Sequence, residues 1–421
     1  MCEQHSGINP TEVMQSLRKL ATSSLVWNRL ECKLQTSIAT TAAAATAAAT
    51  ISGKYSTLAQ QFLEANQKKQ FRTQIQDPEK HTKQHVGLYY TIPDADVKKC
   101  FETKGLSIVY QKQCQLFRET SIMVRQPALE IIDYIKNANY DHPVLRLMLY
   151  GERGVGKTLT LAHVIHFCAM QKWLLVHVHW PSMWKKAWRE ISMSTFKPGR
   201  IDFPLIAVDW LKLFKSQNEA FLQDIKTTSK YIWSKRESAE EGTTLSELIQ
   251  FGLARPRYAS DVVGIILKEV KKSASEKKHR VLVAVDGVNG LWGTTSVKDE
   301  NYDYISCDKI SLFHNFRKIL KNDWSNGIVA GIVDIVANPS DQREKCTPHY
   351  LLQKEAFELL EPFIPVYVPE YNDKEILSCL DYYIDQLWLQ NPKAKTEEGK
   401  KELIFLSNHN PMQLCKICAS C

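Results

Sequence analysis

The sequence lacks any apolar run long enough to cross a membrane. Its longest apolar stretches have the length of a strand and soon meet a polar residue, as the run Val281–Val285 does at Asp286, whereas a spanning helix needs about 20 apolar residues. No apolar secretory segment opens the chain either. We therefore expect no membrane partner.

A disulfide pattern is also missing. The 11 cysteines are spread irregularly over 421 residues, which favours a reducing compartment over a disulfide-stabilised scaffold. Near the end of the sequence, Cys415, Cys418 and Cys421 have a spacing that suits zinc or an iron–sulfur cluster, if a residue such as His409 adds a fourth ligand. A single group of this kind is more often a set of free thiols, so we assign no metal and leave its role open.

The composition is typical of a folded protein with several parts. With 44% hydrophobic and 24% charged residues, the chain can bury one large core, a smaller satellite and still carry a non-globular extension. The net charge of +8 suits an anionic partner such as RNA, although many basic proteins bind no nucleic acid.

Residues 1–52 resemble a mitochondrial presequence followed by a linker. Apolar residues recur at near-helical spacing over residues 13–30 among basic and hydroxyl side chains, and residues 39–50 are nearly all alanine and threonine. An ordinary amphipathic helix on a disordered arm is the alternative, because Glu3, Glu12 and Glu31 fit an import signal poorly. We predict mitochondrial import, cleavage before Gly53, and an extended basic arm over residues 53–85.

An α/β domain is predicted over residues 86–369. Short apolar strands at residues 144–150, 173–178 and 281–285 accompany a helix at residues 159–170. The stretch between the last two strands far exceeds the roughly thirty residues of one βαβ unit, so a largely helical insertion is expected at about residues 183–278. Helical patterns after Pro369 predict a small, lid-like C-terminal domain over residues 370–421.

The strongest motif lies at residues 151–158, which match G-x-x-x-x-G-K-[ST] without a departure. Its glycines let backbone N–H groups turn toward phosphates, its lysine reaches the β- and γ-phosphates, and its hydroxyl binds Mg²⁺. A strand before it and a helix after it complete the required context. The residues predicted to hold a purine nucleoside triphosphate are Gly151, Glu152, Arg153, Gly154, Val155, Gly156, Lys157, Thr158 and Leu159.

Asp286 is the predicted second magnesium ligand, beside Thr158. It ends an apolar strand, and a carboxylate at the carboxyl edge of a parallel strand points into the crevice where the metal lies. The alternative is a strand-ending aspartate that caps a turn at Gly287.

Residues for rapid hydrolysis and for base selection are missing. Gly287 stands where many P-loop ATPases have a glutamate, and Asn289 can orient water but cannot take its proton. We expect slow turnover or none. No N-K-x-D motif is present, and the nearest mimic, at residues 321–323, has the wrong order; GTP, GDP and ATP therefore stay open.

Two basic segments are candidates for RNA contact. Tryptophans and cations interleave over residues 180–189, although Trp184 and Trp188 share a helical face and such residues are more often core. The lysine-rich run at residues 271–280 is the better electrostatic candidate, but a solvated helix end is the default reading.

Beyond these motifs, residues 86–410 resemble one known family: that of the death-associated protein which is also the GTP-binding component of the mitochondrial small ribosomal subunit. The resemblance is carried by the tracts YGERGVGKTLTLAHVIHFCA (150–169), YIWSKRES (231–238), LVAVDGVNGLWG (282–293), KILKNDW (318–324), EPFIPV (361–366) and TEEGKKELIFLSNHNP (396–411).

The resemblance implies an AAA-like P-loop NTPase fold and a structural role in the head of the mitochondrial small ribosomal subunit, in the matrix, among ribosomal proteins and rRNA. It also implies a link to apoptosis, and it leaves contact with the large subunit and with apoptotic partners open. By resemblance, Arg125 with Pro127 lies near the base. Met412 departs from the arginine that ends the lid of AAA relatives, which argues against a motor. The alternative function is a switch or assembly NTPase with slow GTP or ATP hydrolysis.

Overall fold

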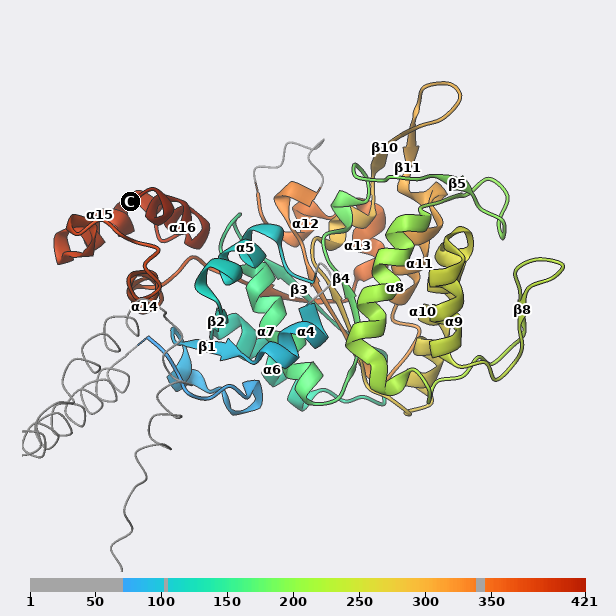
Figure 1. Cartoon of the computed structure of the whole chain (residues 1–421), viewed down its shortest axis with the longest axis horizontal. Helices are drawn as coiled ribbons and strands as arrows, with labels where there is room; N and C mark the ends of the chain where they lie inside the picture. Colours follow the sequence, from blue (N-terminus) through green and yellow to red (C-terminus); the bar gives the residue numbers. More distant parts are fainter. Residues whose placement is uncertain (1–70, 102–104, 338–344) are drawn as a thin grey trace, which may run out of the picture. The chain divides into compact units, whose positions relative to one another are not determined.

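A computed structural model describes residues 71–101, 105–337 and 345–421 (Figure 1). The predicted presequence and linker (residues 1–52) and the first part of the predicted basic arm (residues 53–70) lie outside the described residues. Among the described helices, none has the length and apolar character to cross a membrane.

The helices are α4 (Asp94–Phe101), α5 (Ile108–Phe117), α6 (Gln126–Asn137), α7 (Lys157–Met170), α8 (Pro204–Asn218), α9 (Leu245–Ala254), α10 (Ala259–Ser275), α11 (Ser311–Ile319), α12 (Pro348–Leu351), α13 (Lys354–Leu360), α14 (Asp373–Asp385), α15 (Glu397–Ser407) and α16 (Pro411–Ser420). The strands are β1 (Tyr89–Ile92), β2 (Thr120–Met123), β3 (Leu145–Tyr150), β4 (Leu174–Val178), β5 (Ser192–Met193), β6 (Ile201–Asp202), β7 (Tyr231–Ile232), β8 (Ser238–Ala239), β9 (Val281–Val285), β10 (Thr294–Lys298), β11 (Tyr304–Ser306), β12 (Gly327–Ile332) and β13 (Ile364–Tyr367).

A parallel sheet in the order β13-β3-β12-β9-β4 forms the centre of the domain. β12 lies between β3 and β9, with Ala330 opposite both Leu147 and Ala284. The carboxyl ends of these three strands therefore meet at one edge of the sheet. This arrangement confirms the predicted α/β P-loop fold class.

Helices cover both faces of the sheet (Figure 1). Alternate strand residues point to opposite faces, and the buried residues divide accordingly. Leu147, Leu282 and Ile328 pack with α6 and α7, whereas Met148, Val283 and Val329 pack with α8, α9, α10 and α11. A sheet buried on both sides explains why its strands read as continuous apolar runs.

The region between β4 and β9 holds α8, α9 and α10 and two short antiparallel pairs, β5–β6 and β7–β8. The tryptophan segment near its start belongs to the packed body. Trp184 lies against Phe313 and Phe316, with ring centroids 5.8 and 5.4 Å away, and the Trp188 indole donates to Ser296. Trp184 and Trp188 therefore contribute to the packing of the body, in line with the more conservative of the two interpretations.

The extended-arm prediction is wrong for residues 71–85, which pack onto the body. Phe71 is buried against the C-terminal helices, and Arg72 binds Glu119 at 2.7 Å and Asp385 at 3.3 Å. His81 is buried, with its Nδ1 3.0 Å from Nε2 of His163 on α7. The polar composition suggested an arm, but these few anchors supply enough buried contacts to order the segment.

α14, α15 and α16 enclose a separate small core. Tyr382 stacks on Tyr89 at 4.2 Å between ring centroids, and Leu380, Leu403 and Leu414 are buried. Cys418 is buried in this core, and the described residues contain no group of three or more His, Cys, Asp or Glu side chains arranged to hold a metal.

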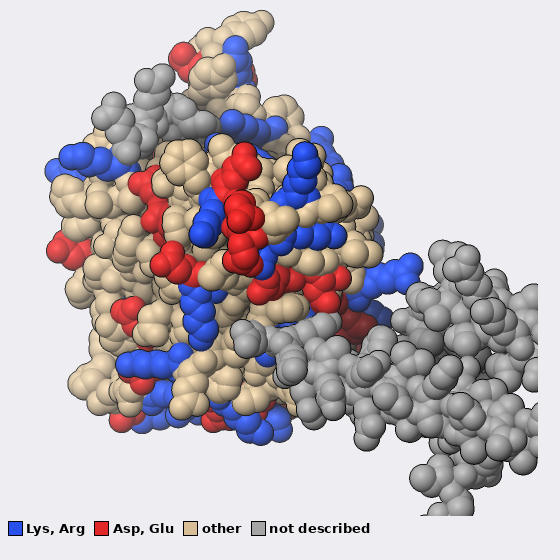
Figure 2. Space-filling view, turned by 90° about the vertical axis from the view of Figure 1, so that its left-hand side faces the viewer, with Lys and Arg blue, Asp and Glu red and all other residues tan. Residues whose placement is uncertain are grey.

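Acidic and basic side chains are intermixed on the face that Figure 2 shows, so this side presents no continuous field of one sign.

Candidate nucleotide-binding site

The phosphate-binding loop joins β3 to α7. Gly154 and Gly156 adopt left-handed backbone angles, with φ of 88° and 94°, which side chains other than glycine rarely tolerate. At Gly151, a Cβ atom would lie 2.3 Å from the carbonyl oxygen of Val368. The motif glycines are therefore required by backbone geometry, and they bring the loop to the N-terminus of a fourteen-residue helix, where the helix dipole favours anions.

Lys157 folds back over this loop. Its side chain is 4% exposed, and Nζ donates to the carbonyl oxygens of Gly151 at 2.9 Å and Glu152 at 2.8 Å. Nζ also lies 3.0 Å from Oδ2 of Asp334. The ammonium group is thus held at the mouth of the loop, where a polyphosphate would bind.

The structure brings together the two residues predicted to share a magnesium ion: the Thr158 hydroxyl donates to Asp286 Oδ2 at 2.9 Å. Burial raises the pKa of Asp286 to about 7; the nearby Asp334 adds to this effect, whereas the Thr158 hydrogen bond and Lys157 oppose it. His179 approaches the same carboxylate at 3.6 Å.

The two oxygen donors fit a magnesium ion. Within the described part of the chain, Asp286 Oδ1 is buried and has no hydrogen-bond partner, which is costly unless a ligand or ion satisfies it. Mg²⁺ prefers carboxylate and hydroxyl oxygens. A bound cation would also favour the ionised carboxylate, against the effect of burial.

Asp334 is a site residue that the sequence analysis missed. It follows β12, two residues after Ile332, and its carboxylate reaches Lys157. An apolar strand ending in an aspartate was the signal that identified Asp286, and the same signal is present here. The sequence could not show that β12 inserts between β3 and β9, which brings its end to the loop.

Arg125 connects the loop to the C-terminal helices. Its side chain is 5% exposed; Nη1 donates to the carbonyl oxygen of Val155 at 2.6 Å, and Nε donates to Glu375 Oε1 at 3.1 Å. Nη2 donates to the carbonyl oxygens of Pro369 and Glu370 at 3.0 and 3.1 Å. The structure therefore brings Arg125 to the site, but these contacts commit its guanidinium to the protein itself.

α16 also reaches the loop. Asn410 caps this helix by accepting from the N–H groups of Met412 and Gln413, and it donates to the carbonyl oxygen of Arg153 at 2.9 Å. The Met412 N–H donates to the carbonyl oxygen of Gly154 at 3.2 Å. A Cβ atom on Gly154 would lie 2.7 Å from both Asn410 Oδ1 and Met412 Cβ. The helix and the loop therefore fit closely.

The position after Asp286 disfavours a water-activating glutamate, because of its backbone conformation and a tight neighbouring contact. Gly287 has φ of 76°, and a Cβ atom there would lie 3.1 Å from the Trp180 ring. Asn289 exchanges hydrogen bonds with the backbone of Asp334, at 2.9 and 3.1 Å. Its amide is thereby held by the neighbouring strand end.

Residues 122–417 match the family described as mitochondrial ribosomal death-associated protein 3. Over 349 residues, the chain is 48% identical to small ribosomal subunit protein mS29 of Mus musculus, covering 83% of this chain and 89% of the relative. The chain is also 48% identical over 348 residues to mS29 of Bos taurus, covering 83% of this chain and 87% of the relative. A solved Walker-type ATPase of Pyrococcus abyssi has 14% identity, a TM-score of 0.37 and coverage of 70% and 65%, values too low to support an argument.

Proposed function

This chain belongs to the mitochondrial ribosomal death-associated protein 3 family, and from that premise we propose that it is a nucleotide-binding structural component of the mitochondrial small ribosomal subunit. Two relatives named small ribosomal subunit protein mS29 match this chain over 89% and 87% of their own length. The corresponding place of action is the mitochondrial matrix, among small-subunit proteins and rRNA, in support of mitochondrial translation.

The observation that carries the nucleotide proposal is that the amides of the loop, Lys157, Thr158 and Asp286 lie together at one edge of the sheet. Lys157 lies over the loop, and the Thr158 hydroxyl binds Asp286, whose second oxygen is buried without a partner among the described residues. The loop amides and Lys157 would hold the phosphates of GTP, GDP or ATP, and Thr158 and Asp286 would hold Mg²⁺. When bound, the metal would neutralise phosphate charge.

A structural ligand is the preferred role for this nucleotide. Gly287 offers no base, Trp180 closes the space beside it, and Asn289 is held by Asp334. Because Arg125 and Asn410 link the loop to the C-terminal helices, nucleotide bound to the loop would stabilise both parts together. At a concentration a hundred times the dissociation constant, binding adds about 2.7 kcal/mol to folding stability.

The alternative is a switch or assembly NTPase with slow hydrolysis, in which a partner supplies the missing catalytic group in trans. The family description includes the words "death-associated", and an association with apoptosis is part of the proposal, although we assign no residue to it.

The test is to purify intact small subunits that contain this chain and to identify the bound nucleotide by mass spectrometry. We expect roughly one retained nucleotide per particle and negligible phosphate release; several turnovers per minute would exclude the structural role. Lys157→Ala should lower nucleotide occupancy and incorporation into the subunit together. Lys354→Ala, at a lysine whose side chain is 87% exposed, is the control, and normal incorporation of an empty Lys157→Ala chain would contradict the coupling.

A further inference from the structure

A group of cations gathers where the β5–β6 loop meets the ends of α10 and α11. We call it the Lys318 cluster. Its members come from three separate segments of the insertion and the following helix: Lys197, Arg200, Lys271, Lys318 and Lys321.

Specific contacts bring these segments together. Ile201 of β6 bridges to Ile310, directly before α11, and the Arg200 guanidinium lies 3.1 Å from Nε2 of His314 on that helix. α10 packs along α11, so that Lys271 Nζ donates to the carbonyl oxygen of Lys318 at 3.3 Å. The grouping is therefore built by the fold.

The cations of this cluster repel one another. Burial and then the other four members lower the pKa of Lys318. Burial and the surrounding cations lower the pKa of His314 to about 4, so this imidazole stays neutral and accepts a hydrogen bond from Arg200. An arrangement of like charges costs stability unless an anion offsets it.

Neighbouring acids balance the cluster only in part. Asp323 pairs with Lys271 at 2.5 Å. Asp202 is 1% exposed next to the loop, and Asp261 accepts from the Thr195 hydroxyl in the loop at 3.4 Å; burial raises the pKa of both carboxyls. Lys197, Lys318 and Lys321 are exposed. The cluster therefore keeps a net positive charge toward solvent.

An exposed aromatic ring stands in the same loop. Phe196 directly precedes Lys197, and 81% of its surface is exposed. A large exposed ring flanked by cations is the combination that proteins use to stack an unpaired base while neutralising its phosphates.

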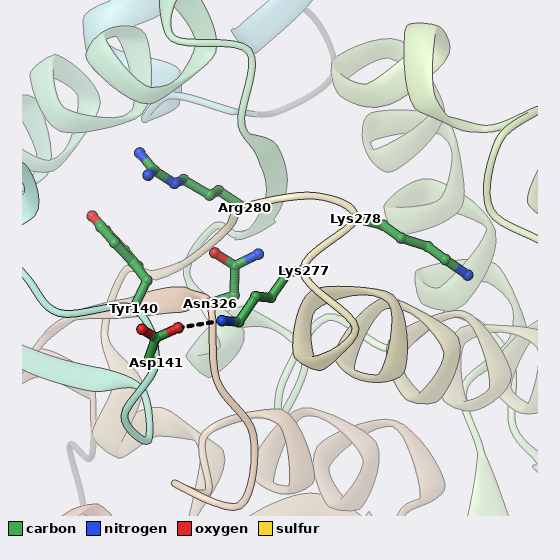
Figure 3. A pocket seen from close by; sticks show the side chains of 6 residues that line it. All are labelled: Tyr140, Asp141, Lys277, Lys278, Arg280 and Asn326. Atoms are coloured by element: carbon green, nitrogen blue, oxygen red, sulfur yellow. Dashed lines mark ion pairs between the residues drawn. The ribbon is translucent and has the colours of Figure 1, made fainter.

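The cavity shown in Figure 3 is a weaker candidate for an anion-binding site, although the lysine-rich run at residues 271–280 forms part of its lining. It has a volume of about 520 Å³. Lys277 pairs with Asp141, Lys278 pairs with Glu276, and Arg280 lies over the Tyr140 ring. These three cations point in different directions, so they do not converge on one ligand (Figure 3).

We propose that the Lys318 cluster binds the phosphodiester backbone of a single-stranded or looped RNA segment, with Phe196 stacking on one of its bases. The proposal rests on the proposed function only in taking RNA of the small subunit as the available partner. RNA phosphates would pair with the unmatched cations, and an RNA base would stack on the exposed ring. An acidic protein segment would pair with the cations alone.

The test measures binding of the full chain to a short mixed-sequence single-stranded RNA by fluorescence anisotropy, over a series of salt concentrations. Each phosphate contact contributes about 0.7 to the slope of log K against log salt for single strands. The double variant Lys318→Gln/Lys321→Gln should therefore make this negative slope shallower by about 1.4 and weaken binding at least tenfold at low salt. Lys354→Gln/Lys393→Gln removes the same charge elsewhere and should change neither quantity.

The Phe196→Ala variant distinguishes binding of RNA from binding of an acidic protein segment. Loss of one stacked base should weaken binding roughly tenfold with an unchanged salt slope. The proposal is overturned if the wild-type chain does not bind RNA, if both double variants lose affinity equally, or if Phe196→Ala has no effect while polyglutamate competes as well as RNA. Nucleotide binding by every variant, measured in parallel, confirms folding; its loss in the wild-type chain would instead contradict the proposed function.

Discussion

Replacing Asp286 by asparagine tests the electrostatics of the site directly. In the folded chain, burial raises the pKa of this carboxyl to about 7, from an ordinary value of 3.8. Between these two pH values the folded chain holds a proton that the unfolded chain has lost, so this group's contribution to stability falls as pH rises from about 4 to 7 and reaches its full cost above 7. Asparagine keeps the shape and an acceptor for Thr158 without the charge.

The magnitude follows from the two pKa values. A tenfold change in a protonation equilibrium is worth about 1.4 kcal/mol, so the ligand-free Asp286→Asn variant should exceed the wild-type chain in unfolding free energy by up to about 4 kcal/mol at pH 8 to 9. This difference in unfolding free energy should shrink by about 1.4 kcal/mol for each pH unit below 7. With saturating Mg²⁺ and nucleotide the wild-type chain gains about 2.7 kcal/mol at a hundredfold excess, and the variant should gain much less.

The assay is urea unfolding across this pH range, with and without Mg²⁺ and nucleotide. Because the buried histidines also titrate, the useful quantity is the difference between the two chains, in which distant groups cancel. Asp303→Asn, at an exposed position beside β11, is the control and should show no pH-dependent difference. An Asp286→Asn chain that is less stable than wild type at high pH, or a difference that does not change with pH, would refute this reasoning.

Three further results are expected. Arg125→Gln leaves Glu375 buried without its cation and should cost about 3–5 kcal/mol in unfolding free energy, whereas adding Glu375→Gln should restore part of it; an unchanged double variant would show that the ion pair is not the cause. Asn410→Ala and Thr396→Ala each remove a helix cap worth about 1 kcal/mol, but only Asn410→Ala should speed nucleotide release in a stopped-flow chase, because Asn410 alone of the two contacts the loop. Burial holds the pKa of His163 well below 6.5, so the unfolding free energy should fall as pH drops below about 6.5, and less steeply in His163→Gln; equal slopes would exclude this histidine.

The sequence was sufficient to predict that residues 151–158 and Asp286 follow the ends of two buried strands, because local composition reveals such strand ends. It predicted that Thr158 and Asp286 share a magnesium ion, and the structure places the Thr158 hydroxyl 2.9 Å from Asp286 Oδ2. The reason is physical: a strand that is buried on both faces has an apolar sequence, and its end is marked by the first polar residue.

Contacts that depend on strand order or on distant packing were not predictable. Asp334 reaches Lys157 only because β12 inserts beside β3, and nothing in the composition of β12 specifies its neighbours. Arg125 was expected near a base, yet its partner Glu375 is 250 residues away in the chain. Likewise, Phe71 and His81 are single anchors in a polar segment, and their burial depends on surfaces formed elsewhere.

The close fit of α16 against Gly154 has a kinetic consequence. Two hydrogen bonds and a contact without space for a methyl group join the helix to the loop, so the loop cannot open widely while the helix remains seated. Movement of the loop and seating of the helix are therefore coupled, so a ligand that orders the loop should also slow detachment of α16.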